Sequence, residues 1–353
     1  MTAGVALARA GWNFRIFERA ERLEAIGAAL SLWPNATEGL RRLDVLDRVF
    51  PLGAPITAML VADRQERPIL ACRAIDGPAI IITRANLQAA LADALPTGAL
   101  VLGKEAAAVE ADANGVRVHF TDGTIEAADV LIDAGGLRSI AAAADGVSYR
   151  GYGGVVALSD PIEDGDLDGL AAEYWGWRER FGLFELPGDR RYWFYMRDQA
   201  VDAAPPTHAA ILSRTAGWTP AIGRAVTATP PDRLIPFSIH ARPAPRTLGE
   251  GRIIRVGDAA HAMEPNLGQG ACQAIEDAVA LEIVARTQSP DRMLSKFEAL
   301  RLKRVTGIVR RAAEGKRGAH GALATQWAMR NALRLLPERI SDHLARSIQT
   351  LPA

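Results

Sequence analysis

Residues 252–278 carry most of the information about the architecture of this chain. They read Arg252-Ile-Ile-Arg-Val-Gly-Asp-Ala-Ala-His-Ala-Met-Glu-Pro-Asn-Leu-Gly-Gln-Gly-Ala-Cys-Gln-Ala-Ile-Glu-Asp-Ala278. The opening residues have the character of a buried strand, and an Ala-rich helix is predicted from about Gln269 to Arg286. A loop shaped by a proline and by glycines separates the two. The segment therefore predicts a strand, a loop and a helix in direct succession.

The residue types in this loop suit a flat cofactor with a sugar-alcohol chain. Asp258 ends the strand, where a carboxylate can accept hydrogen bonds from hydroxyl groups. Gly268 and Gly270 remove side chains where a flat ring must lie against the backbone. The helix start offers free N–H groups and a positive dipole, which would favour a reduced flavin. The same spacing also permits a plain connection in which the glycines form turns and Asp258 is a cap.

Strand and helix patterns alternate towards both ends of the chain. A helix is expected over Thr2–Ala10, closed by Gly11, and a strand over Asn13–Phe17. The middle, from about Tyr149 to Ile239, is strand-like and rich in aromatic residues. This arrangement predicts an α/β nucleotide-binding core that carries a second sheet. Further predicted elements are a helix over Ala36–Phe50, a helix with Thr83 as N-cap, a hairpin turning at Asp122-Gly123 and a strand over Asp129–Asp133.

Composition excludes several classes of function. The 41 basic and 41 acidic residues cancel, so nothing favours nucleic acid or an anionic membrane. The two cysteines, Cys72 and Cys272, have no metal-ligand spacing and are expected to be reduced thiols in a cytoplasmic protein. The N-terminus does not have the pattern of a secretory signal. No run of about 18 apolar residues predicts an integral membrane span.

The segment from Gly257 to Ala278 closely resembles the second flavin-contacting motif of the para-hydroxybenzoate hydroxylase-like FAD monooxygenases, the aromatic-ring hydroxylases. Glu18, the loop at 27–35 and the helix at 83–91 resemble other parts of the same family, in the same order. The resemblance extends from the first helix to about residue 318. The matching residues of the main segment are Gly257, Asp258, Ala259, Ala260, His261, Pro265, Gly268, Gln269, Gly270, Glu276, Asp277 and Ala278.

The resemblance implies an FAD site. Glu18 matches the acid that bonds the adenosine ribose, and Asp258 matches the residue that holds the ribityl or phosphate region. Residues 265–270 then pack against the isoalloxazine, and His261 is expected to be structural. No catalytic residue and no metal ligand is assigned. The implied cofactor-binding residues are Glu18, Arg19, Gly27, Ala28, Ala29, Arg84, Gln88, Asp258, Pro265, Gly268, Gln269, Gly270 and Ala271.

The fold implied by the resemblance is α/β: a three-layer, Rossmann-like FAD-binding core with an inserted β-sheet substrate domain and C-terminal helices. The expected boundaries are 1–55, 83–147 and 246–318 for the FAD-binding domain, 56–82 and 148–245 for the substrate domain, and 319–353 for the helical segment.

The start of the chain departs from the family pattern. That pattern begins with a buried strand and a G-x-G-x-x-G turn, which cradles the cofactor pyrophosphate, whereas this chain opens within the helix that follows. We therefore expect an N-terminally truncated member whose true start lies upstream. Without the first strand, its two neighbours keep unpaired backbone groups, at about 1–3 kcal/mol each when buried.

A second departure lies at Asp133-Ala-Gly-Gly-Leu-Arg-Ser139. Gly135 stands where the family pattern has an acid, and Ala142 stands near the position of an expected arginine. Asp133, two residues early, is a possible substitute, although a polar strand end is the simpler interpretation. In the family this motif is associated with both FAD and NAD(P)H, so the departure is open to affecting the binding or use of either one.

The activity implied by the resemblance is monooxygenation of a small, apolar, aromatic substrate with NADH or NADPH and dioxygen, through a flavin C4a-hydroperoxide. The protein's task is then to hold the substrate over the flavin and to exclude water. The substrate pocket is expected between the flavin and the central β-sheet, with Tyr195 and Phe237 as candidate contacts.

Two other functions remain open. One is a related flavoprotein that epoxidises or oxidises a natural-product intermediate, and the other is a truncated, non-catalytic remnant that acts as a binding protein. The last stretch, Gln326–Thr350, is amphipathic and is expected to pack on the body or against a second subunit, with membrane-surface attachment as the alternative. Either a monomer or a homodimer fits.

Overall fold

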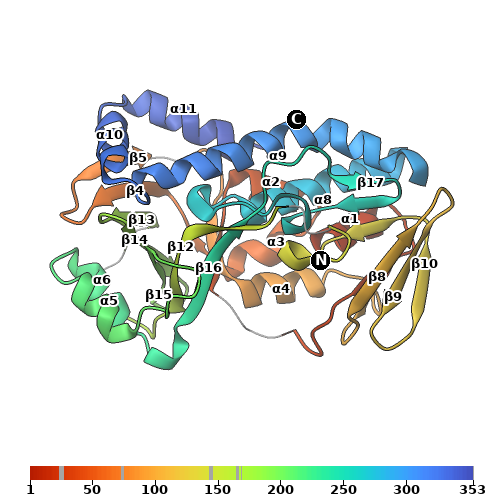
Figure 1. The fold of residues 1–353 in the computed structure, drawn as a ribbon, viewed down its shortest axis with the longest axis horizontal. Coiled ribbons are helices and arrows are strands. Elements are labelled where there is room, and N and C mark those ends of the chain that lie inside the picture. Colours follow the sequence, from red (N-terminus) through yellow and green to blue (C-terminus); the bar gives the residue numbers. More distant parts are fainter. Residues whose placement is uncertain (24–27, 73–74, 143–145, 164–166, 168, 353) are drawn as a thin grey trace.

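The computed structural model describes residues 1–23, 28–72, 75–142, 146–163, 167 and 169–352, and Figure 1 shows their arrangement. Short parallel strands form the centre of one half. β1 (Ile16–Phe17) pairs with β7 (Leu100–Val101), and β11 (Leu131–Asp133) pairs with β18 (Ile253–Arg255), which also holds the antiparallel β17 (Gly249–Glu250). In the described residues no strand pairs with the second edge of β1 or of β11.

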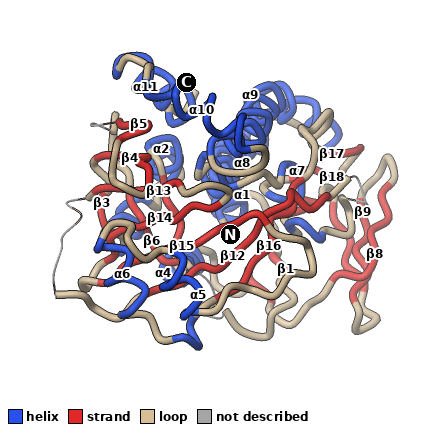
Figure 2. Tube along the Cα trace, turned by 60° about the vertical axis from the view of Figure 1, so that its left-hand side comes forward, coloured by secondary structure: helices blue, strands red, loops and turns tan. Residues whose placement is uncertain are grey.

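Helices and a small antiparallel sheet enclose these strands on opposite sides. The apolar side chains of α1 (Thr2–Arg9), α8 (Gly270–Thr287) and α9 (Met293–Gly315) form one core with Ile254 and Ile132. Figure 2 shows α8 and α9 side by side, with β8 and β9 at the periphery. The Phe17 ring of β1 lies 4.7 Å from the Phe120 ring of that sheet. The predicted three-layer α/β core is confirmed. The small sheet consists of β8 (Ala106–Ala111), β9 (Val116–Phe120) and β10 (Ile125–Ala128).

The other half is built on a sheet that has seven strands in the described residues, in the order β16-β12-β15-β14-β13-β4-β5, here called the large sheet. Every strand comes from the two segments predicted to be β-rich. Helices α5 (His208–Arg214) and α6 (Pro220–Thr227) cover one face, and alternation of side chains along the strands gives the opposite face a separate cluster of aromatic residues. The strands are β4 (Ala58–Asp63), β5 (Pro68–Cys72), β12 (Ser148–Leu158), β13 (Leu170–Trp175), β14 (Glu179–Leu186), β15 (Arg190–Asp198) and β16 (Ile235–Ala241).

A third sheet, β2-β6-β3, joins the two halves. Thr83 caps the helix that follows it, as predicted, because its Oγ1 accepts a hydrogen bond from the N–H of Asn86. The predicted helix over Ala36–Phe50 is wrong in extent: Asp44 has a φ of +61°, which interrupts a helix and leaves two. The elements are β2 (Ala29–Leu32), α2 (Pro34–Arg42), α3 (Leu46–Val49), β3 (Ala54–Pro55), β6 (Ile80–Thr83) and α4 (Arg84–Ala92).

The remaining sequence expectations agree with the structure in kind and differ in length. The hairpin at Asp122-Gly123 is confirmed between β9 and β10, with a φ of +82° at the glycine. The amphipathic C-terminal stretch forms two helices, α10 (Leu323–Arg334) and α11 (Glu338–Gln349), separated at Pro337. None of the helices that the structure describes is both long enough and apolar enough to cross a bilayer. The short helices are α7 (Asp258–His261) and the 3₁₀ turns Phe50–Leu52, Gly136–Arg138, Pro231–Arg233, Pro265–Leu267 (η4), Pro290–Arg292 and Lys316–Gly318.

Candidate functional site

A large cavity opens beside β1, β2 and α4. Its volume is about 1030 Å³, and Glu18, Arg19, Arg84 and Gln88, all predicted cofactor residues, contribute to its lining. Glu18 follows β1 directly, and its backbone N–H donates to the carbonyl of Val101 over 2.9 Å. Small-molecule sites commonly measure about 300–1,000 Å³. The cavity is therefore large enough for a ligand of dinucleotide size.

Arg84 brings positive charge to this cavity from the first position of α4. Its backbone N–H donates to the carbonyl of Ala28 over 3.0 Å, which fixes the helix start against β2. Its side chain is exposed, and no carboxylate in the described part of the chain pairs with it. A guanidinium without a protein partner favours an anionic ligand such as a pyrophosphate. Ala28 and Ala29 are buried at the start of β2, and Gly27 lies outside the described residues.

The loop before α8 brings its backbone close to β2. Pro265 opens η4, and Gly268 ends it in the left-handed region with φ of +61°. A Cβ on Gly268 would lie 2.8 Å from Nε1 of Trp33 and 3.0 Å from Oγ of Ser31. Both the conformation and the close approach therefore require glycine. Gly270 and Ala271 follow as the first residues of α8.

A buried donor lies beside this loop. Trp33 is only 4% exposed, yet its indole N–H has no hydrogen-bond acceptor among the described residues. A buried donor without a partner costs about 1–3 kcal/mol. A ligand that presents an acceptor beside Gly268 would remove that cost, and a flavin ring carries such acceptors.

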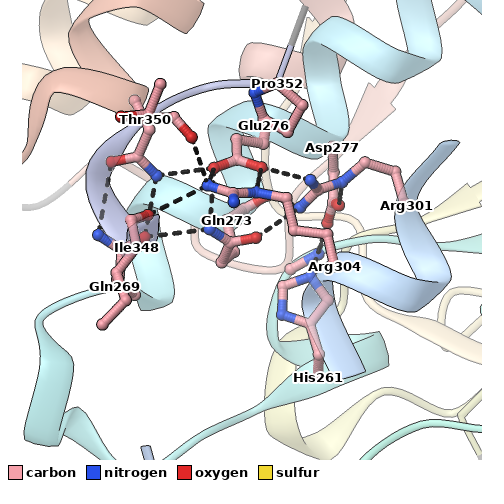
Figure 3. Close-up of polar contacts among 12 residues, drawn as sticks. His261, Gln269, Gln273, Glu276, Asp277, Arg301, Arg304, Ile348, Thr350 and Pro352 are labelled. Carbon is pink, nitrogen blue, oxygen red and sulfur yellow. Dashed lines mark hydrogen bonds and ion pairs between the residues drawn. The ribbon is translucent and has the colours of Figure 1, made fainter. Parts of the chain in front are cut away.

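A buried network of charged side chains holds α8 to α9 beneath the loop (Figure 3). Arg301 Nε donates to Asp277 Oδ1 over 2.8 Å, and its Nη1 pairs with Glu276. Arg304 Nε donates to Glu276 Oε2 over 2.6 Å. The Nη2 of Arg304 also donates to two backbone carbonyls of the C-terminal segment, over 3.1 and 2.9 Å. The network therefore joins α8, α9 and the chain end in one unit.

His261 and Gln269 both belong to this network. His261 is fully buried, with Nε2 2.7 Å from Asp277 Oδ2, a position that suits the structural role expected of it. Burial alone raises the pKa of Asp277, but the charges of His261 and Arg301 outweigh it and hold that pKa well below its usual range. Gln269 is 1% exposed, and its Oε1 accepts hydrogen bonds from Asn35 and Gln273 over 2.9 and 3.0 Å. Gln269 thus braces the loop from within.

The large sheet faces the same loop with a set of side chains here called the sheet wall: Tyr152, Arg180, Phe194, Met196 and Phe237. Tyr152, Phe194, Met196 and Phe237 pack together in one apolar cluster. The guanidinium carbon of Arg180 lies 5.6 Å from the centroid of the Phe194 ring, and Nη2 of Arg180 donates to Met196 Sδ over 3.3 Å. The wall is apolar over most of its area and carries one buried positive charge.

Two hydrogen-bonded contacts connect the sheet wall to η4. Arg180, 2% exposed, donates from Nη2 to Asn266 Oδ1 over 2.7 Å. The Tyr152 hydroxyl donates to Glu264 Oε2 over 2.9 Å and lies 3.3 Å from Asn266 Oδ1. Burial raises the pKa of Tyr152, so its phenol stays a donor. Sequence reasoning missed Arg180 and Asn266, although an arginine that interrupts an apolar strand was an available signal.

The two predicted substrate contacts lie on opposite faces of the large sheet. Phe237 is partly buried against the sheet wall. Tyr195 packs instead towards α5 and α6, where its hydroxyl donates to Glu179 Oε2 over 2.5 Å and accepts from Arg214 Nε over 2.8 Å. Side chains alternate along a strand, so the neighbour Phe194 takes the face that Tyr195 does not.

The segment that departs from the family pattern is organised by Asp133. Its Oδ1 accepts a hydrogen bond from the N–H of Gly135 over 2.9 Å, and its Oδ2 accepts from Ser139 Oγ over 2.6 Å. Both acceptors are thereby occupied by the turn that follows β11, which matches a polar strand end. Ala142 is fully buried, and its carbonyl accepts from Arg242. Asp258 begins α7 with its side chain exposed.

A family model described as an FAD binding domain matches residues 1–312, most of the chain and both halves of the site. The chain belongs to this family. It is accordingly an FAD-dependent monooxygenase of the aromatic-ring hydroxylase type, as its sequence predicted.

Individual relatives cover nearly the whole chain. The Aurachin C monooxygenase/isomerase of Stigmatella aurantiaca is 31% identical and covers 100% of this chain and 96% of its own length. The 3-amino-4-hydroxybenzoate 2-monooxygenase of Streptomyces cremeus is 32% identical, over 88% of this chain and 83% of its own. The crystal structure of Klebsiella pneumoniae HpxO with FAD and uric acid has a TM-score of 0.89 and 28% identity, and covers 98% of this chain and 93% of that chain.

The described residues fit FAD in two independent places. The large cavity offers Arg84 without a protein partner, and the loop offers the close approach at Gly268 beside the unpartnered N–H of Trp33. The individual cofactor contacts remain predictions. The structure brings Glu18, Arg19, Arg84 and Gln88 together around the cavity and places Pro265, Gly268, Gln269, Gly270 and Ala271 in or beside η4.

Proposed function

We propose that this enzyme inserts one oxygen atom of dioxygen into a small, planar aromatic or heteroaromatic ring, with NADH or NADPH as the reductant. The observation that carries the proposal is the contact between Arg180 of the large sheet and Asn266 of η4. This contact places the buried guanidinium of Arg180 and the amide of Asn266 next to the apolar side chains of the sheet wall, beside the loop that fits a flavin. The relatives support the substrate class, because their names include aminohydroxybenzoate, urate and 6-hydroxynicotinate as ring substrates.

Each part of the chain then has a distinct task towards FAD. Glu18, Arg84 and Gln88 would hold the nucleotide end in the large cavity. Gly268 and the first turn of α8 would receive the ring, with the N–H of Trp33 as a donor. When bound, FAD supplies the acceptance of electrons from the nicotinamide and the activation of dioxygen.

The sheet wall binds and orients the substrate. Hydroxylation needs an electron-rich ring, so a ring oxygen that carries negative charge is the form to stabilise. Arg180 is suited to this because it is a permanent cation that is buried, where electrostatic contacts are strong. Glu173 lies 3.2 Å from its Nη1 and keeps the guanidinium in place. Phe194, Met196 and Phe237 exclude water from the reacting ring.

Mass spectrometry of products tests the reaction. FAD-loaded protein is given NADH or NADPH and isotope-labelled dioxygen, with a panel of hydroxybenzoates, hydroxypyridines and purines. We expect a product that gains one labelled oxygen atom, at one nicotinamide oxidised per product. A substrate that loses hydrogen without gaining label would instead establish a dehydrogenase or oxidase.

Substitution of Arg180 tests the residue assignment. We expect Arg180→Gln to lower kcat/KM by roughly 100-fold or more, the size seen when one charge-stabilising donor is removed. FAD should stay bound, because Arg180 lies on the large sheet. Arg197→Gln is the matched control: Arg197 is on the neighbouring strand β15, and its Nε donates to Gln199 away from η4. A control that loses as much activity as Arg180→Gln would contradict the assignment.

A further inference from the structure

A second, smaller cavity is lined by elements that lie on the opposite side of the molecule from strands β8–β10 in Figure 1. Its volume is about 170 Å³, and it is enclosed by the β4–β5 hairpin, the β13–β14 turn and α10. None of the described residues that line it also lines the cavity at Glu18 and Arg84. It is therefore a site of its own, and the proposed reaction does not use it.

Three tryptophans form the apolar walls of this small cavity. Trp175 is buried, whereas Trp177 is 41% and Trp327 is 63% exposed. Large indole surfaces left open beside a cavity are typical of binding sites. The guanidinium carbon of Arg330 lies 4.3 Å from the Trp177 ring centroid and 5.8 Å from that of Trp175. The walls thus combine flat aromatic faces with a stacked cation.

Positive charge exceeds negative charge around the same cavity. Four arginines line it, against the single carboxylate of Asp63. That carboxylate is already shared by Arg67 and Arg334, whose nitrogens lie 2.8 and 2.7 Å from Oδ2. Arg64 is exposed, and no described residue forms an ion pair or hydrogen bond with it. The cavity therefore has cationic groups available to an anion.

Arg330 adds a buried charge with no carboxylate partner in the described residues. It is 5% exposed, and it donates to backbone carbonyls, from Nε to Gly318 over 2.9 Å and from Nη1 to Trp175 over 3.4 Å. Burial, together with repulsion from Arg334, lowers the pKa of Arg330 to about 10. The carboxylate of Asp63 offsets this effect only in part, so a further anion close to Arg330 would be stabilising.

We propose that this cavity binds a small aromatic carboxylate. The ring would lie against the indoles of Trp177 and Trp327, and the carboxylate would face Arg64 and Arg334. Arginine pairs with carboxylates through parallel N–H donors, and flat rings stack on indoles. At about 170 Å³ the cavity is well below the about 300–1,000 Å³ of drug-sized sites, so a single ring fits and a dinucleotide does not.

Fluorine NMR of the full chain labelled with fluorotryptophan gives a direct test. Trp177→Phe and Trp327→Phe assign the two signals of interest among the seven tryptophans. The labelled protein is titrated with benzoate, with benzamide as the neutral ring and with cyclohexanecarboxylate as the anion without a ring. Arg64→Gln removes the cation that has no protein partner, and Arg246→Gln removes an exposed arginine that does not line the cavity.

We expect benzoate to shift the Trp177 and Trp327 signals saturably, with at least ten-fold weaker binding of both comparison compounds. Arg64→Gln should weaken the binding of benzoate at least five-fold, and Arg246→Gln should leave the binding of benzoate unchanged. Three results would overturn the proposal: no saturable shift at millimolar benzoate, equal binding of benzamide, or equal binding by Arg64→Gln. Shifts confined to tryptophans that do not line this cavity would overturn it too.

Discussion

The two sides of the proposed active site hold their shape by different means. On the flavin side, the loop from Gly257 to α8 depends on the positive φ of Gly257 and Gly268 and on the buried charges of Arg301, Glu276 and Asp277. On the substrate side, the sheet wall depends on apolar packing and carries Arg180. The comparison teaches that damage to the flavin side should appear mainly in stability and FAD retention. Damage to the sheet wall should appear mainly in turnover.

The largest effect is expected from Arg301→Met. The substitution removes the cation that contacts both buried carboxylates, Glu276 and Asp277, and breaking such a cluster costs about 3–5 kcal/mol. Urea unfolding should show a fall of that size in the free energy of unfolding, with weaker FAD retention. Arg310→Met is the control, because Arg310 is exposed on the same helix. A loss below about 1 kcal/mol, the upper end of what a surface ion pair contributes, would contradict the role given to this network.

The pH dependence of stability gives a second test of the buried charge network, through Asp277. Its pKa in the folded protein lies below the unfolded value of about 3.9. The stabilisation it provides is therefore complete above that value and is lost as the pH falls towards the folded pKa. Urea unfolding of Asp277→Asn should show its greatest deficit relative to the wild type near neutral pH, shrinking as the pH falls below about 4. A deficit that grows with acid would reverse the assigned sign.

A smaller loss is expected from Gly268→Ala. The new Cβ would occupy a left-handed conformation 2.8 Å from Trp33 Nε1. Strain of this kind costs about 1–3 kcal/mol, and FAD should dissociate at least ten-fold more readily. Gly223→Ala is the control, since nothing lies within 4 Å of a Cβ there, and in helix α6 it should be neutral or slightly stabilising. Flavin fluorescence measures the dissociation of FAD, and thermal unfolding measures the loss of stability. Equal results for the two variants would contradict the special role given to Gly268.

The smallest effect is expected from Tyr195→Phe. It removes hydrogen bonds to Glu179 and Arg214 on the α5–α6 face, so stability should fall by about 0.5–1.5 kcal/mol. Substrate KM and kcat should stay within two-fold of the wild type. Phe194→Leu, one residue away on the sheet wall, should raise KM several-fold. A ten-fold loss of kcat in Tyr195→Phe would show that the two faces have been assigned the wrong way round.

The parts of the fold and the site that could be predicted from the sequence are those set by local sequence patterns. The flavin-side loop was predictable because its glycines, proline and strand-to-helix order lie within 27 consecutive residues, 252–278. The sheet wall was not, because Arg180 and Asn266 are far apart in sequence and meet only once the large sheet docks on η4. The face of Tyr195 depends on strand register, which a one-residue slip inverts. The interruption of the 36–50 helix at Asp44 rests on a positive φ that aspartate adopts only occasionally.

The visible absorption of bound flavin tests most directly whether the sheet wall and the loop form one active site. The FAD-loaded wild type and Arg180→Gln are titrated with the ring substrate identified by product analysis. We predict a saturable change in the flavin spectrum of the wild type, and at least ten-fold weaker binding in Arg180→Gln with the flavin still bound. An identical titration in the two proteins would contradict the placement of the substrate between Arg180 and the flavin.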